Sequence, residues 1–374
     1  MNIVNSGETF RVYGEDVKTF KELPVATYKI GFSIMGGFYL TLHDDLETRE
    51  EKIYGNTNNK VKKALDSFKD ANRNFGIILS GPKGSGKSLF TRALSESAAE
   101  QDIPTIIADM YIDGLEDFIS SIKQEVLIIF DEFEKKFSEN NAQQRLLSLF
   151  DGIDAGKKMF VITCNEIGRL NQYLLNRPGR FHYHFVTSAP SAVEIKEYMT
   201  DKLLPQYHDQ IDNIVSLAMG AEFTYDCLRA IVTELNKGYS VQETFEDLNI
   251  RQENEINMFE VSVITNHGER YSRKYKLNIY DNNEMYMSFG ENYNRFEMAF
   301  EPANMQYDYT HDVFVLTKFT YIPNWTREDF EEMEDDKPKN EVIEKALTRE
   351  PLVMHFKRIK NNNGRFTFPY ALGA

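Results

Sequence analysis

Residues 75–88 read Phe-Gly-Ile-Ile-Leu-Ser-Gly-Pro-Lys-Gly-Ser-Gly-Lys-Ser, an apolar run that leads directly into a glycine-rich loop. The run at 75–80 has the pattern of a buried strand, and the residues after Ser88 have that of a helix. Glycines let backbone N–H groups turn inward around phosphate oxygens, and the N-terminus of a helix favours the same anion. The stretch therefore predicts a phosphate-binding loop between a strand and a helix.

This loop assigns ATP and Mg²⁺ as the expected cofactors. Lys87 can reach the β- and γ-phosphates, and the Ser88 hydroxyl can ligate Mg²⁺. The residues expected to bind ATP here are Gly81, Pro82, Lys83, Gly84, Ser85, Gly86, Lys87, Ser88 and Leu89.

Polar side chains follow two further apolar runs. Residues 126–130 lead into Asp131 and Glu132, and residues 160–163 are followed closely by Asn165. At the tips of parallel strands, Asp131 can orient the Mg²⁺ shell beside Ser88, and Glu132 can polarise the attacking water. Asn165 can position that water. The alternatives are exposed acids at a strand exit and an asparagine that begins a turn.

Two arginines are placed on a tight turn by the sequence Asn-Arg-Pro-Gly-Arg at 176–180. The planar, permanently charged guanidinium groups of Arg177 and Arg180 suit phosphate recognition across an interface. An arginine supplied by a neighbouring subunit can raise a hydrolysis rate by about 10³–10⁵-fold.

Composition narrows the class of protein. The chain has 374 residues, 41% of them hydrophobic, and a formal net charge of −15. This charge argues against non-specific coating of DNA, although it allows a local basic patch. No apolar run of 18 residues occurs, so we expect no membrane span, and the N-terminus lacks the pattern of a secretory signal. The two cysteines, Cys164 and Cys227, lack metal-ligand spacing and indicate a reduced, cytoplasmic protein.

The pattern of runs predicts four parts. Residues 1–50 have the alternation of a small N-terminal β module, and residues 51–190 alternate strand-like and helix-like stretches. The latter is typical of an α/β fold in which helices cover a parallel sheet. Residues 191–250 read as a helical lid, and residues 255–374 as a C-terminal β-rich domain.

The order of these motifs resembles the AAA+ ATPase family of P-loop NTPases, and within it the AAA subgroup called meiotic-clade-like. The resemblance covers about residues 51–250, and the short connection between residues 109 and 126 is similar to that of Bcs1-like members. It implies that Asp131 and Glu132 are the Walker B pair and that Asn165 is the sensor-1 residue. Arg177 and Arg180 would be arginine fingers that act on the ATP of the neighbouring subunit.

The resemblance also implies an adenine pocket lined by Tyr54 and Gly55. A pore loop that grips polypeptide would contain Tyr111 or Ile112, and the alternative is an aromatic that packs on the domain. A second inner loop would contain Lys135 and Lys136, as a cationic contact for nucleic acid or as a solvated helix turn. In the lid, Arg229 lies too late in the sequence for an easy match to a sensor-2 arginine.

These features predict an ATPase that forms a homo-hexamer, because an arginine pair unable to reach its own γ-phosphate needs a neighbour. The catalytic residues would be Lys87, Glu132, Asn165, Arg177 and Arg180. Our first hypothesis is a ring that remodels or assembles a protein partner recruited by the β modules. The alternatives are a motor or loader on DNA or RNA and a nucleotide-gated scaffold.

Overall fold

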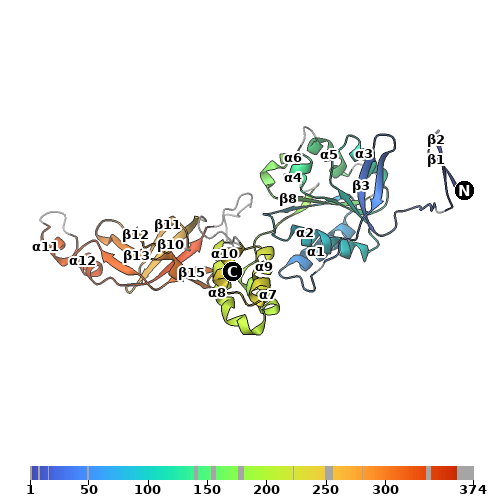
Figure 1. The fold of residues 1–374 in the computed structure, drawn as a ribbon. Helices are drawn as coiled ribbons and strands as arrows, with labels where there is room; N and C mark the ends of the chain where they lie inside the picture. Colours follow the sequence, from blue (N-terminus) through green and yellow to red (C-terminus); the bar gives the residue numbers. More distant parts are fainter. Residues whose placement is uncertain are drawn as a thin grey trace. The chain divides into compact units, whose positions relative to one another are not determined.

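The computed structural model describes residues 2–6, 9–15, 17–48, 50–138, 142–152, 157–175, 181–221, 223–248, 256–279, 281–333 and 338–359. The chain divides into two compact units, residues 1–188 and residues 189–374. Figure 1 follows both units along the sequence from blue to red. No helix among the described residues is long and apolar enough to cross a membrane.

The first unit is built on a mixed sheet, which confirms the α/β class. In its described part, seven strands pair in the order β4-β3-β6-β7-β8-β5-β9. All the pairings are parallel except that of β3 with β4. The strands are β3 (Thr27–Ser33), β4 (Gly37–Leu42), β5 (Phe75–Ser80), β6 (Thr105–Ala108), β7 (Val126–Phe130), β8 (Lys158–Cys164) and β9 (Phe181–Val186).

Helices cover both faces of this sheet, with α1 and α2 on one face and α3, α5 and α6 on the other (Figure 1). Side chains alternate across a strand, so Ile77 and Leu79 join the core under α1 and α2, whereas Ile78 joins the opposite core. The helices are α1 (Thr57–Asp70), α2 (Lys87–Ala99), α3 (Leu115–Ser121), α4 (Phe133–Lys136), α5 (Ala142–Asp151) and α6 (Gln172–Leu175), with a 3₁₀ turn at Ile167–Arg169.

The N-terminal strands differ from the expectation of a separate module over residues 1–50. Strands β3 and β4 extend the large sheet, because β3 pairs in parallel with the outer strand β6. Only β1 (Asn2–Ser6) and β2 (Thr9–Tyr13) form a hairpin of their own in the described part of this segment. Alternation along a strand predicts which face is buried and leaves open which sheet it joins.

The second unit begins with helices, at the place where the sequence predicts a lid. They are α7 (Ala192–Lys202), α8 (Ile211–Ala221), α9 (Tyr225–Asn236) and α10 (Val241–Asp247), with a 3₁₀ segment at Pro205–Gln210. Ser191 begins α7 with a reciprocal capping box to Glu194, and the hydroxyls of Thr224 and Ser240 cap α9 and α10. Side-chain caps satisfy backbone N–H groups at helix starts, which explains these boundaries.

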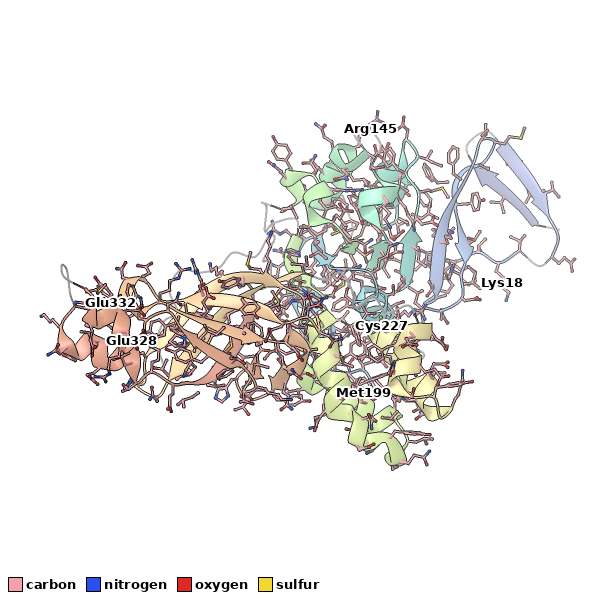
Figure 2. The ribbon with its side chains drawn as sticks, turned by 60° about the vertical axis from the view of Figure 1, so that its left-hand side comes forward. Lys18, Arg145, Met199, Cys227, Glu328 and Glu332 are labelled. Carbon is pink, nitrogen blue, oxygen red and sulfur yellow. The ribbon has the colours of Figure 1, made fainter. Side chains whose placement is uncertain are left out.

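Two antiparallel sheets follow in the described part of the second unit. Their strand orders are β11-β10-β17-β15-β14 and β12-β13-β16, and both sheets contribute to one core. The strands are β10 (Asn257–Thr265), β11 (Arg270–Leu277), β12 (Met285–Phe289), β13 (Phe296–Phe300), β14 (Gln306–Asp308), β15 (Val313–Leu316), β16 (Thr320–Pro323) and β17 (Pro351–Arg358). Short helices α11 (Arg327–Glu331) and α12 (Asn340–Leu347) lie between β16 and β17, with 3₁₀ turns at Asn292–Asn294 and Pro302–Asn304 earlier in the chain. Figure 2 labels Glu328 and Glu332 in the acidic stretch that contains α11.

The helices of the second unit pack directly on its β-rich part through α8. The Arg358 guanidinium, at the end of β17, donates to the carbonyl oxygens of Met219 (3.3 Å) and Gly220 (3.1 Å) in α8. The Met219 side chain also packs on the core of the β sheets. The Tyr309 hydroxyl donates to the Asp212 carboxylate of α8 at 3.1 Å. These contacts join lid and sheets within one unit.

Candidate nucleotide site

The loop after β5 has the backbone that its glycines predict. Gly81, Gly84 and Gly86 have φ values of 154°, 73° and 93°, a region that L residues with side chains rarely adopt. A Cβ atom at Gly81 would overlap the carbonyl and hydroxyl oxygens of Thr187. The Gly81 N–H donates to the carbonyl of Cys164, which ties the loop to β8 at 3.2 Å. Glycine is therefore required at the first position of the loop.

Thr187 braces the loop from the far side, directly after β9. Its N–H donates to the carbonyl of Ser80 at 2.8 Å, and its hydroxyl lies 2.7 Å from the hydroxyl of Ser85. The Ser85 hydroxyl also donates to the Pro82 carbonyl at 2.6 Å. No role was predicted for Thr187 from the sequence, because it lies 102 residues from Ser85 and only the fold brings the two side chains together. Its position after a strand of the same parallel sheet was the available signal.

Lys87 is the first residue of α2 and points back over the loop. Its ammonium donates to the carbonyls of Gly81 (2.6 Å) and Pro82 (2.8 Å) and to Asn165 Oδ1 (2.9 Å). Burial lowers the pKa of Lys87, and the neighbouring carboxylates act in the opposite direction. Ser88 follows it at the start of α2 and is exposed. The structure thus brings together Lys87 and Asn165, which 78 positions separate in sequence.

Asp131 and Glu132 leave β7 beside Thr163 of β8. The Thr163 hydroxyl donates to Asp131 Oδ1 at 2.7 Å and accepts from the Glu132 backbone N–H at 2.9 Å. Glu132 adopts a left-handed backbone, with φ 51° and ψ 46°. Such a conformation is costly for a residue with a side chain and tends to occur at functional sites. No role was predicted for Thr163 from the sequence, although it orients the Asp131 carboxylate and holds the Glu132 backbone.

Lys135 and Lys136 lie against the acid pair. Lys135 Nζ is 2.5 Å from Glu132 Oε1, and Lys136 Nζ is 3.9 Å from Asp131 Oδ2. The hydrogen bond from Lys135 lowers the pKa of Glu132, which partial burial opposes. Phe133 beside them belongs to the core. The two lysines that the resemblance assigned to an inner loop therefore contact the candidate catalytic carboxylates.

Asn165 is held by a third acid of the same segment. Glu134 Oε1 accepts from the backbone N–H of Asn165 at 2.8 Å and from its side-chain amide at 3.1 Å. Only 3% of the Glu134 surface is exposed. No role was predicted for Glu134 from the sequence. The available signal for a buried acid was its position between two apolar residues about one helical turn apart, Phe133 and Phe137, both of which belong to the core.

The segment before α1 provides the candidate base pocket. Tyr54 is buried, and the Lys52 ammonium lies 5.0 Å from the centre of its ring. Gly55 follows with φ 74°. Upstream, the Thr48 N–H and hydroxyl both donate to the Glu96 carboxylate of α2, at 2.5 and 2.7 Å. This pair of bonds fixes the segment to the helix that follows the phosphate loop.

The expected pore loop lies between β6 and α3, and its apolar residues are half-buried. Tyr111 and Ile112 are both in this class, and the Tyr111 ring packs against Phe137 of the core, with centroids 6.4 Å apart. Next to them, Arg145 pairs with Asp113 at 2.7 Å at the surface of the unit (Figure 2). This packing agrees with the alternative of an aromatic that rests on its own domain.

The structure describes one of the three arginines considered for the site. Arg177 and Arg180 lie outside the residues that the structure describes. Arg229 is on α9, with 55% of its side chain exposed, and lies 3.7 Å from Asp226. This placement fits a residue on the lid surface.

The oxygen donors of the site fit a magnesium ion that is bound together with phosphates. No group of three or more His, Cys, Asp or Glu residues that could hold a metal occurs in the described ranges. Mg²⁺ prefers oxygen ligands and is usually held by one or two protein groups plus phosphates and water. The Ser88 hydroxyl and the Asp131 carboxylate, which Thr163 orients, are of this kind.

Comparison with known proteins gives a matching family model for part of the first unit. Residues 77–188 match the ATPase family associated with various cellular activities (AAA). A relative described as "AAA ATPase forming ring-shaped complexes", from Corynebacterium jeikeium, is 25% identical over 144 residues, which cover 31% of this chain and 28% of the relative. The 26S proteasome regulatory subunit S10B homolog B of Arabidopsis thaliana is 28% identical over 184 residues, covering 42% and 45%.

The vesicular-fusion protein SEC18 of Candida albicans is 28% identical over 147 residues, which cover 31% of this chain and 18% of the relative. The chain spans less than half the length of each of these curated relatives. The matched family region contains the phosphate loop, the acid pair and the strands that carry Asn165 and Thr187.

Proposed function

We propose that the chain is a ring-forming ATPase that acts on a protein partner. The proposal proceeds from the match of residues 77–188 to the AAA family model and from the similarity to AAA relatives. One observation supports hydrolysis more than any other. Two adjacent hydrogen-bonded clusters lie at the tips of β5, β7 and β8: Lys87 and Glu134 contact Asn165, and Thr163 contacts the Asp131 carboxylate and the Glu132 backbone. Pre-organised charges and dipoles of this kind provide most of the catalysis in phosphoryl transfer.

The residues take distinct roles in this proposal. The loop amides and Lys87 bind the phosphates, which compete with the loop carbonyls for the ammonium protons of Lys87. Glu132 takes a proton as water attacks the γ-phosphorus, while the bond from that phosphorus to the bridging oxygen breaks. Asn165 orients the water through its amide. Ser88 and Asp131 would hold Mg²⁺, which when bound neutralises charge on the phosphates.

Lys135 acts on the protonation state of the proposed base, Glu132. The hydrogen bond from Lys135 lowers the pKa of Glu132 and so favours the ionised form of its carboxylate. The same bond occupies one carboxylate oxygen, Oε1. The proposal therefore requires Glu132 either to use its other oxygen or to leave Lys135 during turnover.

The oligomer and the arginines belong to the same proposal. A homo-hexamer in which Arg177 and Arg180 reach the neighbouring γ-phosphate would complete the site. The printed description of the Corynebacterium relative as forming ring-shaped complexes supports a ring. The finer placement in the meiotic-clade and Bcs1-like subgroup rests on motif order, and a cytoplasmic location rests on cysteine use.

A protein partner is favoured over a nucleic acid for a structural reason. A cationic channel requires free lysines, whereas Lys135 and Lys136 lie against carboxylates. The relatives include a proteasome regulatory subunit and a vesicular-fusion protein. The second unit would recruit the partner and move with the lid, because Arg358 and Tyr309 join the two parts.

Steady-state ATP hydrolysis tests this proposal. The rate would be measured at physiological salt alone, with single- and double-stranded DNA, with RNA, and with an unfolded polypeptide. We expect stimulation by polypeptide only. Stimulation by nucleic acid that declines as salt rises would instead show a DNA or RNA motor. ATP-dependent assembly without turnover would show a scaffold.

Glu132→Gln provides the matched control for the chemistry. This variant keeps the size of the side chain and removes the base, so it should bind ATP and lose turnover. Because it holds ATP, it is also the form in which to measure ring assembly by analytical ultracentrifugation. Hydrolysis by Glu132→Gln at the wild-type rate would exclude Glu132 as the base.

A further inference from the structure

Glu134 has no part in the roles assigned above, yet it contacts the residue that would orient the attacking water. It is 3% exposed, and its Oε1 accepts two hydrogen bonds from Asn165. We propose that Glu134 is a positioning residue that sets the orientation of the Asn165 side-chain amide for hydrolysis. This inference rests on the proposed ATPase function.

An asparagine side chain has a donor end and an acceptor end, and an ionised carboxylate only accepts. Glu134 Oε1 therefore selects the Nδ2 end of Asn165, at 3.1 Å, and turns Oδ1 the other way. That oxygen lies 2.9 Å from Lys87 Nζ, at the phosphate loop. An acceptor facing the phosphates is the group needed to take a hydrogen bond from an attacking water.

The backbone bond makes the arrangement more rigid. Glu134 Oε1 also accepts from the Asn165 backbone N–H at 2.8 Å, so one carboxylate oxygen fixes both the main chain and the side chain. Hydrogen bonds to a charged acceptor are about twice as strong as neutral ones. Glu134 itself belongs to the segment of Asp131 and Glu132, so its hydrogen bonds tie Asn165 to the segment that carries the acid pair.

A contribution to the stability of the fold does not explain why residue 134 is a glutamate. Its second oxygen, Oε2, is buried and has no hydrogen-bond partner among the residues that the structure describes. A buried carboxylate oxygen without a partner destabilises the fold, whereas a neutral amide of the same shape is less costly to bury. A residue kept only for stability would be better replaced by glutamine. The acid is explained if the strength of its bonds to Asn165 matters for turnover.

The test measures hydrolysis, ATP affinity and stability of the full chain in matched variants. Glu134→Gln keeps the shape and a weaker acceptor, and Glu134→Leu removes the acceptor. Asn165→Ala and the double variant Glu134→Leu with Asn165→Ala test whether the two residues act together. Glu166→Gln is the control, because Glu166 is exposed, adjacent to Asn165, and paired with Arg169 at 2.7 Å.

We expect kcat to fall about fivefold in Glu134→Gln and about 30-fold or more in Glu134→Leu, following the strength of the lost hydrogen bonds. The dissociation constant for a fluorescent ATP analogue should change by about twofold or less, since the phosphates bind elsewhere. The melting temperature of Glu134→Gln should equal or exceed that of the wild type. The double variant should be no slower than Asn165→Ala, because the two residues act as a unit.

Several results would overturn the inference. Wild-type turnover in both Glu134 variants would do so, and so would losses that multiply in the double variant. If Glu134→Leu does not fold, an unchanged kcat in Glu134→Gln would have the same meaning. A wild-type chain that binds ATP without hydrolysing it would instead refute the proposed function, and the role of Glu134 would fall with it.

Discussion

Replacing Gly81 by alanine should disturb the phosphate loop for a steric and a conformational reason. The added Cβ would overlap the carbonyl and hydroxyl oxygens of Thr187 and lie 3.0 Å from its carbonyl carbon. Two of these atoms belong to backbone, and Thr187 is itself bonded to Ser80 at 2.8 Å. The neighbour therefore has little freedom to move away. In addition, φ at Gly81 is 154°, which alanine rarely adopts.

The expected size of the effect follows from these two contributions. An L residue held in an unfavourable positive-φ conformation costs about 1–2 kcal/mol. Overpacking against a rigid neighbour adds about 1–3 kcal/mol. Gly81→Ala should then lower the free energy of unfolding by about 2–5 kcal/mol. The loop or the end of β9 must also shift, so ATP affinity should fall.

Two other glycines separate the contributions. Gly86, at the start of α2, has φ 93° and open space around a built Cβ, so Gly86→Ala should cost only the conformational term of about 1–2 kcal/mol. Gly168 has open space and no positive φ. Gly168→Ala should be neutral or stabilise by about 0.4–1 kcal/mol. The expected order of stability is Gly168→Ala, then Gly86→Ala, then Gly81→Ala.

Urea unfolding followed by circular dichroism at 222 nm would measure these differences. The chain has a single tryptophan, Trp325, which lies in the second unit. Its fluorescence therefore reports unfolding of the unit that contains none of the three glycines, and this transition should not move. The steric reasoning is refuted if Gly81→Ala is as stable as Gly86→Ala, or if it binds ATP with wild-type affinity.

Three further predictions concern charged side chains. Lys135→Met removes the bond that lowers the pKa of Glu132, so that pKa should rise and the acid limb of the pH–rate profile should move to higher pH; an unmoved limb would contradict Glu132 as the titrating base. Arg349 is 1% exposed and donates within the second unit, to Asn294 at 2.9 Å among others. Arg349→Met should therefore destabilise that unit by about 3–5 kcal/mol in Trp325 fluorescence, and a loss below about 1 kcal/mol would count against the buried network. Arg358→Met should lower the free energy of unfolding of the second unit by about 1.5–3 kcal/mol in the same assay, because α8 loses its hydrogen bonds to β17. It should also weaken the stimulation of ATP hydrolysis by polypeptide. Stimulation at the wild-type level would show that the contact between α8 and β17 does not couple the sheets to hydrolysis.

Much of the nucleotide site was predictable from local sequence. The spacing of Gly81, Lys87 and Ser88 after an apolar run predicted the strand, loop and helix that the structure has. The acid pair at the end of β7 was predictable because strand ends in a parallel sheet meet at one edge. These features depend on residues close together in sequence and on one general rule of topology.

The tertiary structure decided the contacts between distant segments. Strands β3 and β4 could be recognised locally, but their place beside β6 depends on pairing across about 80 residues, which alternation does not encode. Thr163, Thr187 and Glu134 act through side-chain hydrogen bonds to other strands or loops. No local pattern distinguishes such residues from ordinary polar ones.

The lysines of the inner loop show the same limit. By sequence, the alternatives for Lys135 and Lys136 were a cationic contact in a pore and a solvated helix turn. Only the fold places them within 2.5 and 3.9 Å of Glu132 and Asp131. The order of the amino acids is enough to predict which chemical groups this protein has and in which order its strands present them. The tertiary structure decided which of these groups meet, because charge pairing and orientation depend on distances that only the packed chain defines.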